Sequence, residues 1–177
     1  MLDDVMKTLK VLALPGSLRK TSLNAAMLCM AAASAPTGVR VALYTGLGDL
    51  PPFNPDLELN IPEKVADLRD QIAQADALLI ASPEYAHGLS GVMKNALDWM
   101  VSSAVFVDKP VALWNASPRA SIALAALRET LVVMSARMVQ GASLELLILS
   151  TNPAEPPINP DPMAMKRALL ELQTACS

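Results

Sequence analysis

The sequence predicts an α/β fold in which helices cover both faces of one parallel sheet. Short apolar runs alternate with longer amphipathic stretches, which is the pattern of strands joined by crossover helices. The 177 residues are enough for one domain that buries about 70% of its unfolded surface. Loops rich in glycine, proline and hydroxyl groups follow two of the apolar runs, where folds of this class carry their ligands.

The first strand is expected at residues 8–14, followed by a helix at 22–33 that is rich in Ala, Met and Leu. A second strand is expected at 39–44. The stretch 51–62 contains several prolines and is too long for a plain connector, so it is a candidate lid or packing loop. It leads into a helix at 63–74.

The second half continues the alternation, with strands at 76–81 and 110–115 and helices at 91–102, 120–136 and 163–174. A fifth strand is expected between Met138 and Leu149, where Gly141 suggests a break or bulge. Five such strands fit a three-layer sandwich with the flavodoxin-like order 2-1-3-4-5, whose ligand crevice lies between strands one and three. We expect residues 1–177 to form this single domain.

Composition excludes several classes of protein. The net charge of −3 provides no basic stripe for nucleic acid. Two distant cysteines and one histidine predict neither a disulfide framework nor a metal site, and they fit a reducing cytoplasm. No apolar run is long enough to suggest a membrane span, and residues 1–7 lack the pattern of a secretion leader. We therefore expect neither membrane insertion nor secretion. Because 53% of the residues are hydrophobic, we expect some apolar surface to be buried between subunits of a homo-oligomer.

The loop 15–24 joins the first strand to its helix and is a candidate phosphate site. Free N–H groups at a helix N-terminus attract phosphate, and hydroxyls and a guanidinium add hydrogen bonds. The candidates are Ser17, Arg19, Ser22 and Asn24. The alternative is that Ser22 or its neighbour caps the helix and Arg19 is a solvated surface charge. The nucleotide motifs G-x-x-x-x-G-K and G-x-G-x-x-G are absent, which disfavours a nucleoside triphosphatase.

The loop 82–88 follows the third strand and offers backbone donors and an aromatic ring without an obvious nucleophile. This combination suits a flat ring system with polar edges, such as a flavin. Glu84 is either a general acid or a structural carboxylate that accepts from backbone N–H groups. His87 either takes part in the chemistry or only shapes the loop with its backbone. Trp99 is expected in the core or at a subunit interface, and Cys29 is expected to be buried.

Four segments closely resemble the NADPH-dependent FMN reductase family, which includes flavodoxin-like quinone, chromate and azo-dye reductases. They are GSLRKTSLN at 16–24, PFNPD at 52–56, PEYAHG at 83–88 and KNALDW at 94–99. The resemblance extends from about Leu9 to Ile148. It implies an FMN whose phosphate is held at Ser17, Arg19, Ser22, Leu23 and Asn24. It also implies a flavin edge against Pro83, Glu84, Tyr85, Ala86, His87 and Gly88, and an assembly of two or four subunits.

Two departures from the family pattern lie at the implied site. Ala86 stands where many members carry Asn, so only backbone contacts with the flavin remain at that position. The stretch 115–119 replaces a sequence that is Gly-rich in many members. By the resemblance, this stretch would line the flavin ring or receive the nicotinamide nucleotide. Within it, Ser117 is a candidate for the flavin ring, and Arg119 is either a candidate for a phosphate of the nicotinamide nucleotide or a surface arginine at a helix start.

The activity implied by the resemblance is an FMN-dependent NAD(P)H oxidoreductase. NADPH or NADH would pass a hydride to the flavin N5, and the flavin would reduce a quinone, an azo compound, a metal oxyanion or free flavin. No catalytic side chain is needed, because the cofactor carries the chemistry. Backbone N–H groups of 84–88 would fix the ring and stabilise its reduced form. The alternatives are a flavin-binding module without turnover and a one-electron carrier, although the chain is only 3% aromatic.

Overall fold

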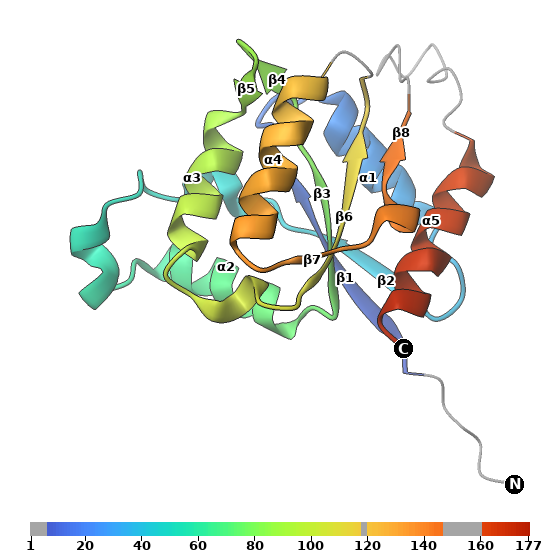
Figure 1. The fold of residues 1–177 in the computed structure, drawn as a ribbon, viewed down its shortest axis with the longest axis horizontal. Helices are drawn as coiled ribbons and strands as arrows, with labels where there is room; N and C mark the ends of the chain where they lie inside the picture. The colour runs from blue at the N-terminus through green and yellow to red at the C-terminus, as the bar shows by residue number, and fades with distance from the viewer. Residues whose placement is uncertain (1–6, 118–119, 147–160) are drawn as a thin grey trace, which may run out of the picture.

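Parallel strands form the central sheet of the computed structural model, which describes residues 7–117, 120–146 and 161–177. The strand order is β2-β1-β3-β6-β7, and β8 also pairs with β6 (Figure 1). The strands are β1 (Leu9–Pro15), β2 (Val39–Leu43), β3 (Ala77–Ala81), β6 (Pro110–Asn115), β7 (Arg137–Met138) and β8 (Leu144–Glu145). The flavodoxin-like order predicted from the sequence is therefore confirmed.

The fifth strand position is interrupted, as the glycine suggested. β7 and β8 both pair in parallel with β6, and the short 3-10 helix η4 (Gln140–Ala142) lies between them. Gly141 sits in this helix. The preceding helix ends earlier than predicted, because Ser135 adopts a φ of 63° and the N–H of Ala136 turns back to the carbonyl of Leu131.

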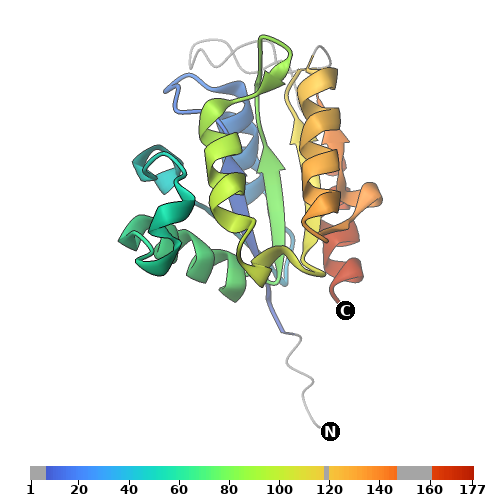
Figure 2. The same cartoon turned by 60° about the vertical axis from the view of Figure 1, so that its left-hand side comes forward.

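Helices cover both faces of the sheet (Figures 1 and 2). One face carries α1 (Leu23–Ala33) and α5 (Pro162–Ala175). The other carries α2 (Glu63–Gln74), α3 (Gly91–Met100) and α4 (Ser121–Val133). Every residue of β3 and β6 is buried, which explains why these strands are continuous apolar runs. No described helix is long and apolar enough to cross a membrane.

The proline-rich stretch packs against α3, which supports the packing alternative. It includes the 3-10 helix η2 (Pro55–Leu59), and it follows η1 (Gly46–Asp49). The carbonyl of Pro51 accepts from the indole Nε1 of Trp99 at 2.7 Å. Phe53 meets the same indole edge-on, with ring centroids 5.1 Å apart. Trp99 is fully buried, so it is a core residue.

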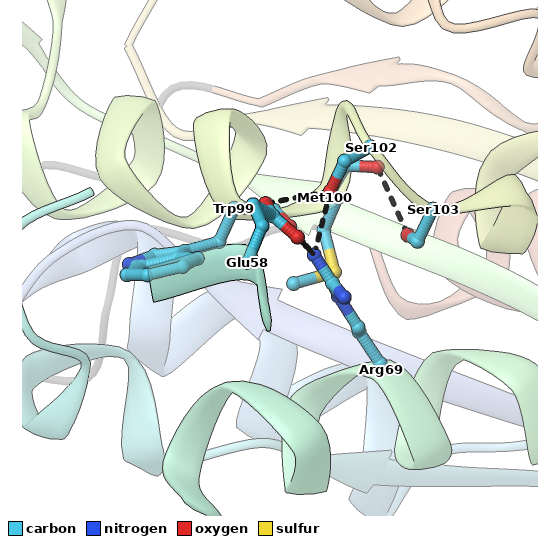
Figure 3. Close-up of polar contacts among 6 residues, drawn as sticks. All are labelled: Glu58, Arg69, Trp99, Met100, Ser102 and Ser103. Carbon is cyan, nitrogen blue, oxygen red and sulfur yellow. Dashed lines mark hydrogen bonds and ion pairs between the residues drawn. The ribbon is translucent and has the colours of Figure 1, made fainter. Parts of the chain in front are cut away.

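Arg69 holds the outer part of this stretch (Figure 3). Its Nη2 donates to the carbonyl of Trp99 at 2.6 Å and to the Oγ of Ser102 at 2.8 Å, and it lies 3.2 Å from Glu58 Oε2. The hydrogen bond from Ser102, followed by the contact with Arg69, holds the pKa of Glu58 below its usual value despite partial burial. These contacts join η2, α2 and α3 into one unit.

The prediction for Cys29 was wrong, because this cysteine is exposed. Helix α1 buries Asn24, Met27, Leu28 and Ala31. These positions are three or four residues apart and therefore share one face of the helix. Cys29 lies on the opposite face.

Candidate functional site

A cleft of about 320 Å³ opens at the carboxyl ends of β1, β3 and β6. The arrowheads of these strands point toward the upper part of Figure 1. The cleft is the ligand crevice of the doubly wound fold, and its volume is in the range of small-molecule sites. Its lining residues are Ser17, Arg19, Thr21, Ser22, Leu23, Asn24, Pro83, Glu84, Tyr85, Asn115, Ala116, Ser117 and Ala120. The three walls come from the loop before α1, the segment after β3 and the segment between β6 and α4.

The N-terminus of α1 forms the first wall. Ser22 caps the helix by accepting from the N–H of Ala25 at 3.2 Å, as the capping alternative required. The N–H groups of Leu23 and Asn24 have no acceptor within the described residues. They carry the positive end of the helix dipole, and Arg19 adds a cation to the same wall. This wall is therefore suited to an anion.

Two buried asparagines connect the first and third walls. Asn24 Oδ1 accepts from the N–H of Ala116 at 3.1 Å, so its side-chain oxygen has a structural role. Asn115 Oδ1 accepts from the N–H of Ser117 at 3.1 Å. The Nδ2 of Asn115 is buried and has no acceptor within the described residues. This donor is covered by protein atoms, so among the described residues it remains an unpaired buried group beside the cleft.

Gly16 lets the loops after β1 and β3 approach each other closely. Its N–H donates to the carbonyl of Ala81 at 2.8 Å. A Cβ at this position would lie 2.6 Å from the Oγ of Ser82 and 3.0 Å from its Cα. Only a residue without a side chain fits, so the spacing of the first two walls depends on this glycine.

The second wall is a β-hairpin rather than the irregular loop expected from the sequence. β4 (Glu84–Tyr85) pairs antiparallel with β5 (Gly88–Leu89). Ala86 and His87 form the turn with φ values of 49° and 59°. Two consecutive positive φ values are the signature of a type I′ turn, which usually carries Asn-Gly. The pair Ala86-His87 lacks this signal, so the hairpin could not be predicted from the sequence.

Glu84 connects the hairpin to the start of α4. Its Oε2 accepts from the N–H groups of Ala123 at 2.9 Å and Ile122 at 3.0 Å. Its Oε1 lies 3.1 Å from His87 Nδ1. The hydrogen bond from Ala123, opposed by burial and assisted by His87 and Ile122, holds the pKa of Glu84 below its ordinary value. The carboxylate is therefore ionised at neutral pH. This favours the structural role, in which Glu84 accepts hydrogen bonds from backbone N–H groups, over the role of a general acid.

Nine of the predicted site residues line the cleft: Ser17, Arg19, Ser22, Leu23, Asn24, Pro83, Glu84, Tyr85 and Ser117. Ala86, His87 and Gly88 belong to the hairpin beyond the wall, and their contact with a bound ring stays a prediction. The side chain of His87 is 78% exposed. Arg119 lies outside the described residues.

Four further residues line the cleft, Thr21, Asn115, Ala116 and Ala120. Asn115 and Ala116 belong to the stretch 115–119, which the resemblance had already placed near the flavin ring or the nicotinamide nucleotide. The sequence interpretation missed Thr21 and Ala120 as lining residues. Ala120 carries no chemical signal, and its place in the third wall follows only from the fold.

Comparison with known proteins adds independent information. Residues 9–148 match the family described as NADPH-dependent FMN reductase. An NAD(P)H-dependent FMN reductase of Pseudomonas aeruginosa is 41% identical over 120 residues, which cover 66% of this chain and 62% of that protein. An NADPH:quinone oxidoreductase of Arabidopsis thaliana is 40% identical over 111 residues, which cover 59% of this chain and 56% of that protein. The chain thus spans about three fifths of the length of these relatives.

Among solved structures, the flavoenzyme NAD(P)H:(acceptor) oxidoreductase FerB from Paracoccus denitrificans is similar over nearly its full length. The TM-score is 0.74, with 29% sequence identity and 94% of each chain covered.

Proposed function

The chain belongs to the NADPH-dependent FMN reductase family, and we propose that it is an FMN-dependent NAD(P)H oxidoreductase. In this proposal NAD(P)H donates two electrons, and a quinone, an azo compound, a metal oxyanion or free flavin accepts them. Bound FMN would supply the hydride chemistry between donor and acceptor. The observation that carries the proposal is the cleft wall at α1, where the free N–H groups of Leu23 and Asn24 adjoin Arg19.

The residues present fit FMN. Its phosphate is a dianion, and the first wall offers N–H groups, hydroxyls and a guanidinium without a carboxylate. The proposed phosphate residues are Ser17, Arg19, Ser22, Leu23 and Asn24. The hairpin beside the cleft suits a ring with polar edges. The proposed ring residues are Pro83, Glu84, Tyr85, Ala86, His87, Gly88 and Ser117.

The chain's own residues bind and orient rather than react. The dipole of α1 and the cation of Arg19 favour the anionic end of a ligand at the first wall. Glu84 is ionised and does not act as a proton donor. Its two carboxylate oxygens contact His87 in the hairpin and the N–H of Ala123 in α4. Backbone N–H groups of 84–88 are the proposed donors to the ring edge, where they would stabilise negative charge.

The first test measures the binding of FMN and of riboflavin, using the quenching of flavin fluorescence as the signal. Arg19→Ala should weaken FMN binding by about tenfold and leave riboflavin binding unchanged, because only FMN carries the phosphate. Arg40→Ala is the matched control, since it removes an exposed arginine on β2 away from the cleft. Equal losses for the two ligands would contradict the phosphate assignment.

The second test separates an enzyme from a flavin-binding module or a one-electron carrier. The FMN-loaded protein is mixed anaerobically with NADPH, and the flavin absorbance near about 450 nm is followed. Bleaching that a quinone reverses supports the reductase. A protein that binds FMN but stays oxidised is a module or a carrier.

We also propose that the chain forms a homo-oligomer through the outer face of α4. This face exposes Ile122, Val132 and Val133, and the last of these is 75% exposed. Light scattering on a sizing column should show more than one subunit, and Val133→Lys should shift the protein toward a monomer.

The cytoplasm is the compartment we propose, because Cys29 and Cys176 are both free thiols. We further propose that residues 1–177 act as one FMN-binding domain.

A further inference from the structure

The first turn of α4 depends on a carboxylate from a distant part of the chain. Ala120 occupies the N-cap position and provides no side-chain cap. Glu84 accepts the N–H groups of Ile122 and Ala123 instead, across 38 and 39 residues of sequence. Its side chain is only 13% exposed. The helix start and the hairpin are therefore joined by charge-assisted hydrogen bonds that water screens little.

The same carboxylate also contacts the turn of its own hairpin. His87 Nδ1 lies 3.1 Å from Glu84 Oε1, and both Ala86 and His87 have positive φ values. Such a backbone persists only when surrounding contacts hold it in place. Glu84 supplies one of these contacts and anchors the strand that enters the turn.

Glu84, Tyr85 and Ala120 all line the cleft, so the link spans two of its walls. We propose that Glu84 is a positioning residue that locks the hairpin 84–89 onto α4 and thereby fixes the spacing between the second and third walls. The inference deepens the proposed function and rests on it where flavin binding is concerned. The carboxylate acts through the backbone that it holds, without reacting itself.

A plain helix cap would stabilise α4 and do nothing for the cleft. The chain offers a matched example in Asp161, whose Oδ1 accepts from the N–H of Met163 at the start of α5. Helix α5 supplies no residue to the cleft wall. Asp161→Ala therefore measures the effect of losing a carboxylate cap alone.

The first experiment uses the protein without flavin and measures amide hydrogen exchange. Glu84→Ala should speed exchange in the first turn of α4 and also across the hairpin 84–89. Asp161→Ala should speed exchange only at the start of α5. If Glu84→Ala affects α4 but leaves the hairpin protected, the positioning role is overturned, whatever the protein binds.

The second experiment measures dissociation constants for FMN and riboflavin. Glu84→Ala should weaken the binding of FMN and of riboflavin by the same factor, about tenfold or more. The lost contact acts on the ring side of the cleft, and the two ligands have the same ring. Glu84→Gln keeps an oxygen that accepts the two N–H groups and should recover most of the affinity. Asp161→Ala should bind both as the wild type does. Wild-type affinity in Glu84→Ala would overturn the inference, whereas a wild type that binds no FMN would instead refute the proposed function.

Discussion

Replacing Ala86 by glycine should stabilise the protein, although glycine usually does the opposite. Ala86 has a φ of 49° at the first central position of the hairpin turn. The left-handed region costs an L-residue about 1–2 kcal/mol, which glycine avoids. Glycine loses about 0.5–1 kcal/mol more backbone entropy on folding. The difference predicts a gain of about 0.5–1 kcal/mol in the free energy of unfolding for Ala86→Gly.

Thermal denaturation followed by circular dichroism measures this gain. For a chain of this size, 1 kcal/mol moves the midpoint by about 2–4 °C, so Tm should rise by about 1–4 °C. Ala73→Gly on the exposed face of α2, in its last turn, is the matched control and should lower stability by up to about 1 kcal/mol. Gly38→Ala is the opposite change and should lower stability, because Gly38 has a φ of 82° and an added Cβ would lie 2.8 Å from the side chain of Gln173.

The three variants together test whether the turn at Ala86 is strained. A rise for Ala86→Gly with falls for Ala73→Gly and Gly38→Ala supports the strained turn. If Ala86→Gly lowers Tm as much as Ala73→Gly does, the left-handed turn does not exist in solution. The assignment of the segment as a type I′ hairpin would then be wrong.

Three further predictions concern the cleft and its support. Gly16→Ala should weaken FMN binding and cost about 1–3 kcal/mol of stability, measured by titration and urea unfolding, because its Cβ would lie 2.6 Å from a side-chain oxygen. Burial and then the hydrogen bond to Asp67 raise the pKa of Tyr44 to about 12. The folded state therefore favours the neutral phenol, and stability should fall between about pH 10 and 12 but less so in Tyr44→Phe. Arg69→Gln should lower stability by about 1–3 kcal/mol in urea, because it removes the donor from the carbonyl of the fully buried Trp99.

Local signals predicted the start of α1 and both ends of α2 well. Helix α2 begins directly after Pro62 and ends at Gln74, as its amphipathic pattern indicated. Helix α1 begins directly after Ser22, a residue type that caps helices. In both cases the residues that decide the boundary lie within one turn of it. Prediction from sequence is strong where cause and effect are close along the chain.

The hairpin and the third wall depend on contacts that no local pattern contains. The turn pair Ala86 and His87 lacks the asparagine and glycine that mark type I′ turns. The cap of α4 comes from Glu84, 39 residues before Ala123. Ala116 enters the cleft because Asn24 holds its N–H across 92 residues. Such pairings become visible only when the sheet order brings the loops together.

The cleft is electrically asymmetric because its two helix N-termini differ. The first turn of α1 leaves N–H groups free beside Arg19, whereas the first turn of α4 is already occupied by the carboxylate of Glu84. An anionic group is attracted to the first terminus, where N–H groups are free, whereas Glu84 already pairs with N–H groups at the second. In the proposed FMN complex the phosphate is therefore expected at α1 and the ring toward the hairpin. The residue proposed to lock the second wall in place also takes up N–H groups at the other helix start, which links the shape of the cleft to its polarity.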